Sequence, residues 1–204
     1  MTQQSALIRI VDDDPTVCEA QSFFLRLAGF EVVSYNNPLD FFRLDDHRRL
    51  GCVILDVRMP QMSGIEVQTR MQKEGINLPI IFLSAHGDIE MAIGCVKRGA
   101  FNFLVKPPEP EKLSELVAQA VKKNRDDQRQ ADYVRSLEAQ FSELTQAESQ
   151  IAVMVAKGLS NKTIAEALEV SERTVQTHRS SVYLKLDCTN AVEVAEFLHD
   201  LKGE

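Results

Sequence analysis

The chain has 204 residues, a formal net charge of −7, and a composition of 44% hydrophobic and 26% charged residues, which is ordinary for a globular protein of one or two domains. No stretch approaches the roughly 20 apolar residues that a membrane-spanning helix needs, and the N-terminus lacks the basic segment of a signal peptide, so we expect a cytoplasmic protein without membrane contacts. The negative average argues weakly against nucleic-acid binding, but charge can be segregated between domains.

Four cysteines lie far apart in the sequence and include no C-x-x-C pair. This spacing favours buried free thiols in a reducing compartment over a disulfide or a metal site.

Short apolar runs alternate with amphipathic segments in the first part of the chain. The runs predict five β-strands, at residues 7–11, 31–35, 52–55, 79–83 and 101–105. The first intervening helix has Asp14 as a candidate N-cap and Pro15 at its first position, and a later one has the capping-box spacing of Ser63 and Glu66. Strands that alternate with helices predict an α/β fold with a doubly wound parallel sheet and right-handed crossovers.

A long polar helical pattern follows this α/β region. Residues 110–142 contain no Gly or Pro after Pro110, and good helix formers dominate them. We predict one long helix, or two nearly continuous helices, while a flexible charged linker is the alternative.

The last segment, residues 143–204, is helical throughout in its pattern. Capping-box spacing recurs at Thr145 with Glu148 and at Asn190 with Glu193. Between them the pattern predicts a short helix near 160–168 and a longer one near 170–186, so we expect an all-α domain.

Polar side chains follow four of the predicted strands directly. Asp12 and Asp13 follow the first strand, Asp56 the third, Ser84 the fourth and Lys106 the fifth. The carboxyl ends of parallel strands meet at one edge of the sheet, where ligands of such folds bind. Each residue also has a plainer interpretation, as a helix cap, a turn residue or a surface charge. Their common position favours one site.

Clustered carboxylates repel one another unless a cation neutralises them. Oxygen ligands at such an edge suit Mg²⁺, which takes one or two carboxylates and keeps several waters. Lys106 would add a fixed positive charge, and Ser84 a hydroxyl. Asp56 could then attack a phosphoryl group while these cations absorb the developing charge.

Four motifs carry a resemblance over roughly residues 5–125: "VDDDP", "LDVRMPQMSGIE", "LSAHGD" and "LVKPP". On these motifs the chain resembles the receiver domain of two-component response regulators, which implies a five-stranded, flavodoxin-like fold. We place the receiver at residues 1–121, a helical linker at 122–142 and a second domain at 143–204.

The resemblance also implies residue roles at the acidic edge. Asp56 is then the phosphoacceptor. Asp13, Asp56 and the backbone carbonyl of Arg58 hold Mg²⁺ (or Mn²⁺), and Asp12 acts through a metal-bound water.

Three further roles follow from the resemblance. Lys106 pairs with the phosphoryl oxygens, Ser84 is the switch hydroxyl, and Phe103 is the switch aromatic that rotates inward behind it. The Lys106–Pro107 peptide is expected to be cis. Phe103 has a second interpretation as an ordinary packing residue of an edge strand.

Residues 144–186 resemble the helix-turn-helix domain of the LuxR/FixJ/NarL type, with "GLSNKTIA" and "TVQTHR" as the clearest pieces. Six Lys or Arg against ten Asp or Glu give residues 141–204 a net charge of −4, whereas five against three give residues 157–185 a net of +2. One domain should therefore bind DNA weakly and with strong salt dependence, and dimerisation should contribute.

The helix after Ser171 supplies the candidate DNA contacts. Gln176, Thr177 and Ser180 lie opposite its apolar side and are the candidate base readers. The candidate phosphate contacts are Lys162, Thr174, His178, Arg179 and Lys185, of which Arg179 lies nearest the buried side. The final helix supplies the expected dimer surface at Val192, Ala195 and Leu198. A plain amphipathic surface helix is the alternative for 172–185.

These features predict a phosphorylation-activated transcription regulator rather than an enzyme, apart from Mg²⁺-dependent self-phosphorylation of Asp56. The expected partners are a sensor histidine kinase, double-stranded promoter DNA, a second copy of the chain and RNA polymerase. Two other functions remain open: a phosphatase or phosphotransferase that uses the same aspartates, and a signalling adaptor that never binds DNA.

Overall fold

The structure is a computed structural model, and it describes residues 6–85 and 89–202 of the chain. The chain forms two compact units that meet in the sequence between Asp127 and Gln128. The last three residues of the motif "LSAHGD", 86–88, lie outside the described residues.

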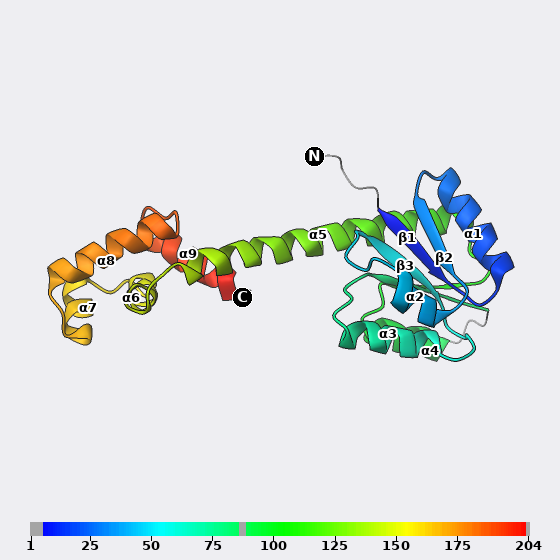
Figure 1. Cartoon of the computed structure of the whole chain (residues 1–204), viewed down its shortest axis with the longest axis horizontal. Coiled ribbons are helices and arrows are strands. Elements are labelled where there is room, and N and C mark those ends of the chain that lie inside the picture. The colour runs from blue at the N-terminus through cyan, green and yellow to red at the C-terminus, as the bar shows by residue number, and fades with distance from the viewer. Residues whose placement is uncertain (1–5, 86–88, 203–204) are drawn as a thin grey trace. The chain divides into compact units, whose positions relative to one another are not determined.

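The first unit is a five-stranded parallel sheet with helices on both faces (Figure 1). Its strands are β1 (Leu7–Val11), β2 (Glu31–Tyr35), β3 (Gly51–Asp56), β4 (Ile80–Ser84) and β5 (Asn102–Val105). Its helices are α1 (Pro15–Leu27), α2 (Pro38–Leu44), α3 (Gly64–Lys73), α4 (Ile89–Lys97) and the first part of α5 (Pro110–Ser142). The strand order β2-β1-β3-β4-β5 confirms the predicted doubly wound fold.

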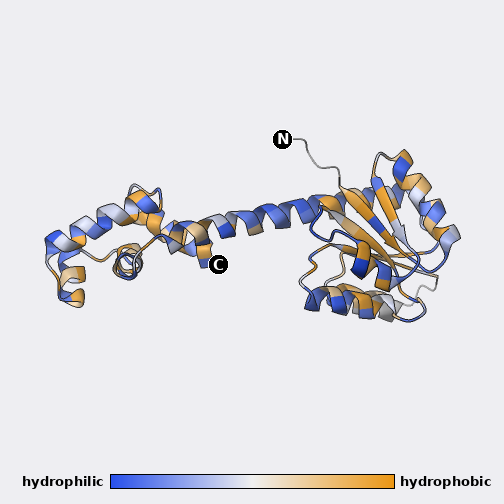
Figure 2. Ribbon diagram, in the orientation of Figure 1, coloured by the Kyte–Doolittle hydropathy of each residue, from blue (hydrophilic) through white to orange (hydrophobic). Residues whose placement is uncertain are grey.

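The three central strands, β1, β3 and β4, are buried on both faces, so alternate residues of one strand enter different apolar layers. Ile10 of β1 belongs to the layer that contains Leu25 of α1 and Val117 of α5. Its neighbour Val11 belongs to the opposite layer, with Val67 of α3. Figure 2 shows the strands as the most consistently hydrophobic part of this unit.

Capping residues start the helices where the sequence predicts. The Asp14 side chain accepts a hydrogen bond from the Thr16 N–H at 2.8 Å, with Pro15 as the first helical residue of α1. Ser63 and Glu66 form the expected capping box at α3.

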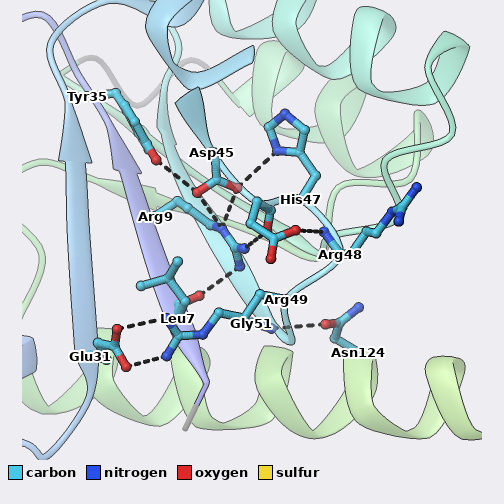
Figure 3. A network of polar contacts seen from close by, with 11 residues as sticks. Leu7, Arg9, Glu31, Tyr35, Asp45, His47, Arg48, Arg49, Gly51 and Asn124 are labelled. Carbon is cyan, nitrogen blue, oxygen red and sulfur yellow. Dashed lines mark hydrogen bonds and ion pairs between the residues drawn. The ribbon is translucent and has the colours of Figure 1, made fainter. Parts of the chain in front are cut away.

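Strand β1 contains a buried arginine, Arg9, whose partners the apolar pattern of the strand does not predict. The Arg9 side chain is fully buried and its Nε donates to Asp45 Oδ2 at 2.9 Å (Figure 3). Its other nitrogens donate to the carbonyl oxygens of Leu7, at 2.9 Å, and Asp46, at 2.6 Å. The Tyr35 hydroxyl donates to Asp45 Oδ1 at 2.9 Å, so the carboxylate is also well satisfied. The network joins β1 to the segment after α2.

Asn124 fixes α5 to the opposite end of the sheet from the acidic edge. Its side chain is buried, accepts from the Gly51 N–H at 3.0 Å and donates to the Asn77 carbonyl at 3.1 Å. One residue of α5 thereby satisfies two backbone groups, and Figure 3 shows its bond to Gly51 at the start of β3.

The second unit is all-α, as predicted. Its helices after α5 are α6 (Gln146–Ala156), α7 (Asn161–Leu168), α8 (Glu172–Lys185) and α9 (Ala191–Lys202). One apolar core joins them, and it includes Leu137 and Phe141 from the last turns of α5. Thr145 and Glu148 form the predicted capping box of α6.

The predicted capping box of α9 forms only in part. Asn190 accepts from the Glu193 N–H at 3.0 Å, as the spacing implies. The Glu193 carboxylate, however, accepts from the Thr189 N–H at 2.6 Å rather than from the Asn190 backbone. Only the carboxylate half of the box is therefore displaced by one residue.

All four cysteines are free thiols, and Cys18, Cys52 and Cys95 are buried. Cys188 is half-buried, so the expected burial fails at this position. Burial raises the pKa of Cys18 to about 11 and that of Cys52 to about 12, which keeps both as neutral thiols near neutral pH.

Candidate functional site

The sheet brings the predicted acidic edge together. Register pairs Val11 with Leu55, Asp56 with Leu83 and Ser84 with Val105, so the ends of β1, β3, β4 and β5 lie level. The side chains that follow these ends are largely withdrawn from water: Asp12, Asp56 and Ser84 are 2%, 6% and 3% exposed.

Lys106 joins the two buried carboxylates. Its Nζ lies 2.5 Å from Asp12 Oδ2 and 2.5 Å from Asp56 Oδ1. The second Asp56 oxygen accepts from the Arg58 N–H at 2.7 Å, and Asp12 Oδ1 accepts from the Asp14 N–H at 3.1 Å. Two carboxylates share one ammonium, which leaves an excess of negative charge that a further cation would neutralise.

Burial and ion pairing shift the pKa values of this cluster in opposite directions. Burial raises the pKa of Asp12, and the hydrogen bond from Lys106 offsets only part of that rise. Burial alone would lower the pKa of Lys106, but its bonds to Asp12 and Asp56 outweigh burial and raise it. Lys106 therefore stays an ammonium at neutral pH, as a partner for an anion must.

The backbone around Asp56 leaves no room for a side chain at Gly64. A Cβ there would lie 2.2 Å from the Asp56 carbonyl oxygen. The Gly64 N–H donates to the Val57 carbonyl at 3.0 Å, which holds the start of α3 against the end of β3. On the other side of the cluster, the Lys106–Pro107 peptide is cis, as the resemblance implied.

The other predicted receiver residues differ in exposure. Asp13 is exposed, whereas Phe103 is half-buried and packs against the layer of α3 and α4. Within the part of the chain that the structure describes, no three Asp, Glu, His or Cys side chains lie close enough to hold a metal by themselves. The two buried carboxylates, Asp12 and Asp56, are oxygen donors that fit Mg²⁺ with retained waters and not a metal that needs a full protein cage.

The second candidate site is the outward face of α8. Ser160 caps α7 and Ser171 caps α8, while Val175 and Val182 bury the inner side of α8. The predicted base readers are all exposed on the opposite side. They line one shallow surface concavity together with three residues that the sequence did not single out: the full lining is Arg173, Gln176, Thr177, Ser180, Ser181 and Leu184.

The predicted phosphate contacts divide into free and engaged side chains. Lys162 is exposed, whereas the Thr174 hydroxyl is 2.8 Å from Ser171 Oγ and His178 is half-buried. Arg179 donates through Nε to the Tyr183 hydroxyl at 2.8 Å. Its partial burial agrees with the expected position near the inner side.

Lys185, a predicted phosphate contact, has partners within the protein. Its Nζ lies 2.7 Å from the Glu148 carboxylate and 3.0 Å from the Glu143 carbonyl. Glu148 is buried, and the hydrogen bond from Lys185 lowers its pKa to about 2. The charge of Lys185 is therefore already paired in the protein.

The predicted dimer residues lie on α9. Val192 is 66% exposed, and Ala195 and Leu198 are half-buried, while Val194 and Phe197 of the same helix enter the core. No helix of the described residues is both long enough and apolar enough to cross a membrane.

Comparison with known proteins matches a family model to each part of the chain. Residues 8–118 match the model of the response regulator receiver domain, and residues 142–198 match that of the luxR family of bacterial regulatory proteins. The chain is 36% identical over 202 residues to the response regulator protein TmoT of Ectopseudomonas mendocina, covering 99% of this chain and 92% of TmoT. It is 31% identical over 187 residues to the transcriptional regulatory protein FixJ of Bradyrhizobium diazoefficiens, covering 92% and 91%.

Two solved structures of response regulators also match this chain over nearly its whole length. The response regulator StyR matches with a TM-score of 0.85 and 35% identity, covering 96% of this chain and 98% of StyR. Full-length FixJ from B. japonicum matches with a TM-score of 0.59 and 29% identity over the whole of both chains.

Proposed function

Because the chain belongs to the NarL/FixJ family of two-component response regulators, with a receiver domain and a LuxR-type DNA-binding domain, we propose that phosphorylation of Asp56 controls its binding to promoter DNA. The phosphoryl donor is a phosphohistidine of a sensor histidine kinase. The observation that carries the proposal is the Asp12–Lys106–Asp56 cluster at the ends of three strands.

The geometry supports a direct phosphoryl transfer. An oxygen of the Asp56 carboxylate attacks phosphorus, the bond from phosphorus to the histidine nitrogen breaks, and the imidazole leaves with that electron pair. Lys106 then exchanges its bond to Asp56 for one to the phosphoryl oxygens, where the charge now lies. The Arg58 N–H remains available to Asp56 throughout, since it is a backbone donor 2.7 Å from Oδ2.

Mg²⁺, or Mn²⁺, would supply charge neutralisation for this transfer when bound. Asp13, Asp56 and the Arg58 backbone carbonyl would hold it, with Asp12 acting through a water. The residual negative charge of two carboxylates against one ammonium supports a cation at this edge.

Ser84 and Phe103 would couple the phosphorylated site to the rest of the receiver. Ser84 is the last residue of β4 and is buried at the acidic edge, while Phe103 is half-buried in β5. The two residues lie on neighbouring strands, since Phe82 pairs with Phe103 and Ser84 with Val105. Movement of the Ser84 hydroxyl towards the phosphoryl group, with Phe103 turning inward, shifts a pre-existing equilibrium towards the active form.

The outward face of α8 would then read the major groove. Gln176, Thr177 and Ser180 offer polar groups to base edges, and the exposed Lys162 offers its charge to phosphate. The net charge of +2 over residues 157–185 is small, so one unit alone binds weakly.

Dimerisation compensates for this weakness. On α9, Val192, Ala195 and Leu198 supply the DNA-bound contact. In the first unit, Val96 of α4 and Val105 of β5 remain about half exposed and give the phosphorylated form an apolar contact of its own. A dimer bound beside a promoter would also be within reach of RNA polymerase.

The test compares wild type with Asp56→Asn in the presence of acetyl phosphate and Mg²⁺. Wild type should gain one phosphoryl group by mass spectrometry and bind a promoter fragment more tightly, while Asp56→Asn should do neither. Asp14→Asn is the matched control, because Asn also caps helices and the Asp14 side chain bonds to Thr16 and not to the ion cluster, while its backbone N–H is unchanged by the substitution. Equal DNA affinity of wild type and Asp56→Asn after phosphodonor treatment rejects the proposal, and repeated turnover of the donor would favour an enzyme.

A further inference from the structure

Asn161, the first residue of α7, connects the two helices of the helix-turn-helix. Its Nδ2 donates to Gln176 Oε1 at 2.7 Å, and its Oδ1 accepts from Arg179 Nη1 at 2.9 Å. The helix itself does not need this side chain, since Ser160 caps α7 by accepting from the Thr163 N–H at 3.2 Å. Both polar atoms of the Asn161 amide are therefore hydrogen-bonded to side chains of α8.

The directions of these hydrogen bonds fix the orientations of the three side chains one after another. Tyr183 and the guanidinium of Arg179 are joined at 2.8 Å, which holds Arg179 in place. Arg179 can only donate, so it requires the oxygen end of Asn161 and turns the Asn161 NH₂ towards Gln176. That NH₂ in turn requires the oxygen end of Gln176. The NH₂ of Gln176 is left as the end without a protein partner among the described residues.

This order matters because a glutamine amide has two chemically opposite ends. Adenine is recognised when the amide donates to N7 and accepts from N6, so an amide held the wrong way round faces the wrong partners. An oxygen has two lone pairs, and Gln176 Oε1 can therefore accept from both Asn161 and a base. A long side chain that is already fixed also loses less freedom when it binds.

We propose that Asn161 is a positioning residue for sequence reading: it orients Gln176 on α8 and so contributes to discrimination between base sequences without touching DNA. This inference rests on the proposed function, in which the outward face of α8 reads bases. A purely structural bond between α7 and α8 would stabilise the unit but would leave the preferred base unchanged.

The expected effect follows from what Asn161 supplies. A well-placed pair between a side chain and a base is worth on the order of 5- to 150-fold in discrimination. Releasing one long side chain should lose roughly 3- to 10-fold of this. The Asn161→Ala variant should therefore lower the ratio of specific to non-specific affinity by that factor.

The experiment uses the full chain after acetyl phosphate treatment. Wild type first selects duplexes from a random-sequence library, and the selected duplex and a scrambled duplex of equal composition serve as probes. Affinities for both are measured for wild type, Asn161→Ala, Gln176→Ala and the double variant. Lys162→Ala is the control, because a neighbouring phosphate contact should weaken both probes alike and leave their ratio unchanged.

Two results support the inference together. The ratio should fall in Asn161→Ala, and the same substitution should have no further effect when Gln176 is already alanine. An unchanged ratio in Asn161→Ala, or an equal loss in the Gln176→Ala background, overturns it. Failure of wild type to prefer its selected duplex over the scrambled one would instead reject the proposed function.

Asn161→Asp provides a second measurement, which tests the inference even if the alanine variant is unstable. A carboxylate still accepts from Arg179 and suits the start of a helix, but it cannot donate to Gln176 Oε1. Gln176 should reverse its amide, so a repeated selection should yield a different base at one position. The added charge weakens all sequences equally and does not alter the base preference. Identical selected sequences from wild type and Asn161→Asp contradict the inference.

Discussion

The Arg9–Asp45 pair offers the sharpest test of how the receiver sheet is stabilised. Asp45→Asn removes the negative charge and keeps the size of the side chain. The Arg9 side chain is fully buried and that of Asp45 is 1% exposed, so no water replaces the lost partner. Two of the Arg9 bonds, to the Leu7 and Asp46 carbonyls, survive and hold the charge in place. Removing one partner of a buried pair costs about 3–5 kcal/mol, and we expect the lower end of that range.

Hydrogen exchange is the suitable assay, because a chain of two units does not unfold in one step. The amides of β1 and β3 exchange through opening of the sheet, so a loss of about 3 kcal/mol should speed their exchange by roughly 150-fold. Amides of α6 to α9 should be unaffected.

An exposed pair in the same unit supplies the control. Asp40 and Arg43 lie 2.8 Å apart, but their side chains are 40% and 73% exposed. Asp40→Asn should cost no more than about 1 kcal/mol, as surface pairs do. If Asp45→Asn also costs less than about 1 kcal/mol, the pair is solvated and the reasoning from burial fails.

Three further changes test other contacts. Acid should lower the stability of the second unit by up to roughly 3 kcal/mol as the pH falls from 4.5 towards 2. The folded pKa of Glu148 is about 2, so the stability that its carboxylate contributes is lost as the group is protonated over this range. Glu148→Gln should flatten this pH dependence, as measured by hydrogen exchange of the α6 amides. Gly64→Ala should displace Asp56 and slow its phosphorylation on the order of tenfold or more by mass spectrometry, and an unchanged rate would contradict the close approach. Lys185→Met should leave the salt slope of DNA binding unchanged, whereas Lys162→Ala should reduce it by about one.

The fold and the acidic edge follow from patterns that are local in the sequence. Apolar runs located all five strands, and capping residues such as Asp14 and Ser63 located helix starts. Because the predicted strands are parallel, the sequence placed Asp56 and Lys106 at the same edge of the sheet. The strand order, with β4 between β3 and β5, came only from the structure. The periodicity did not single out α2, whose seven residues give less than two full turns of pattern.

The remaining contacts join residues that no local pattern relates. Arg9 and Asp45 are 36 positions apart, and Lys185 and Glu148 are 37 apart. In the sequence Arg9 interrupts an apolar strand, and Lys185 is one basic residue among several. Only the packing shows that each charge is already paired, and for Lys185 this changes what it can offer to DNA.

The shared helix α5 has a practical consequence for dissecting the protein. Asn124 supports the loops of the first unit, and Leu137 fills the core of the second. A fragment that stops at residue 121 would leave the Gly51 N–H and the Asn77 carbonyl without partners, and one that begins at 143 would open a cavity where Leu137 stood. Separately expressed halves should therefore be divided between 125 and 136, where neither hydrophobic interior is breached.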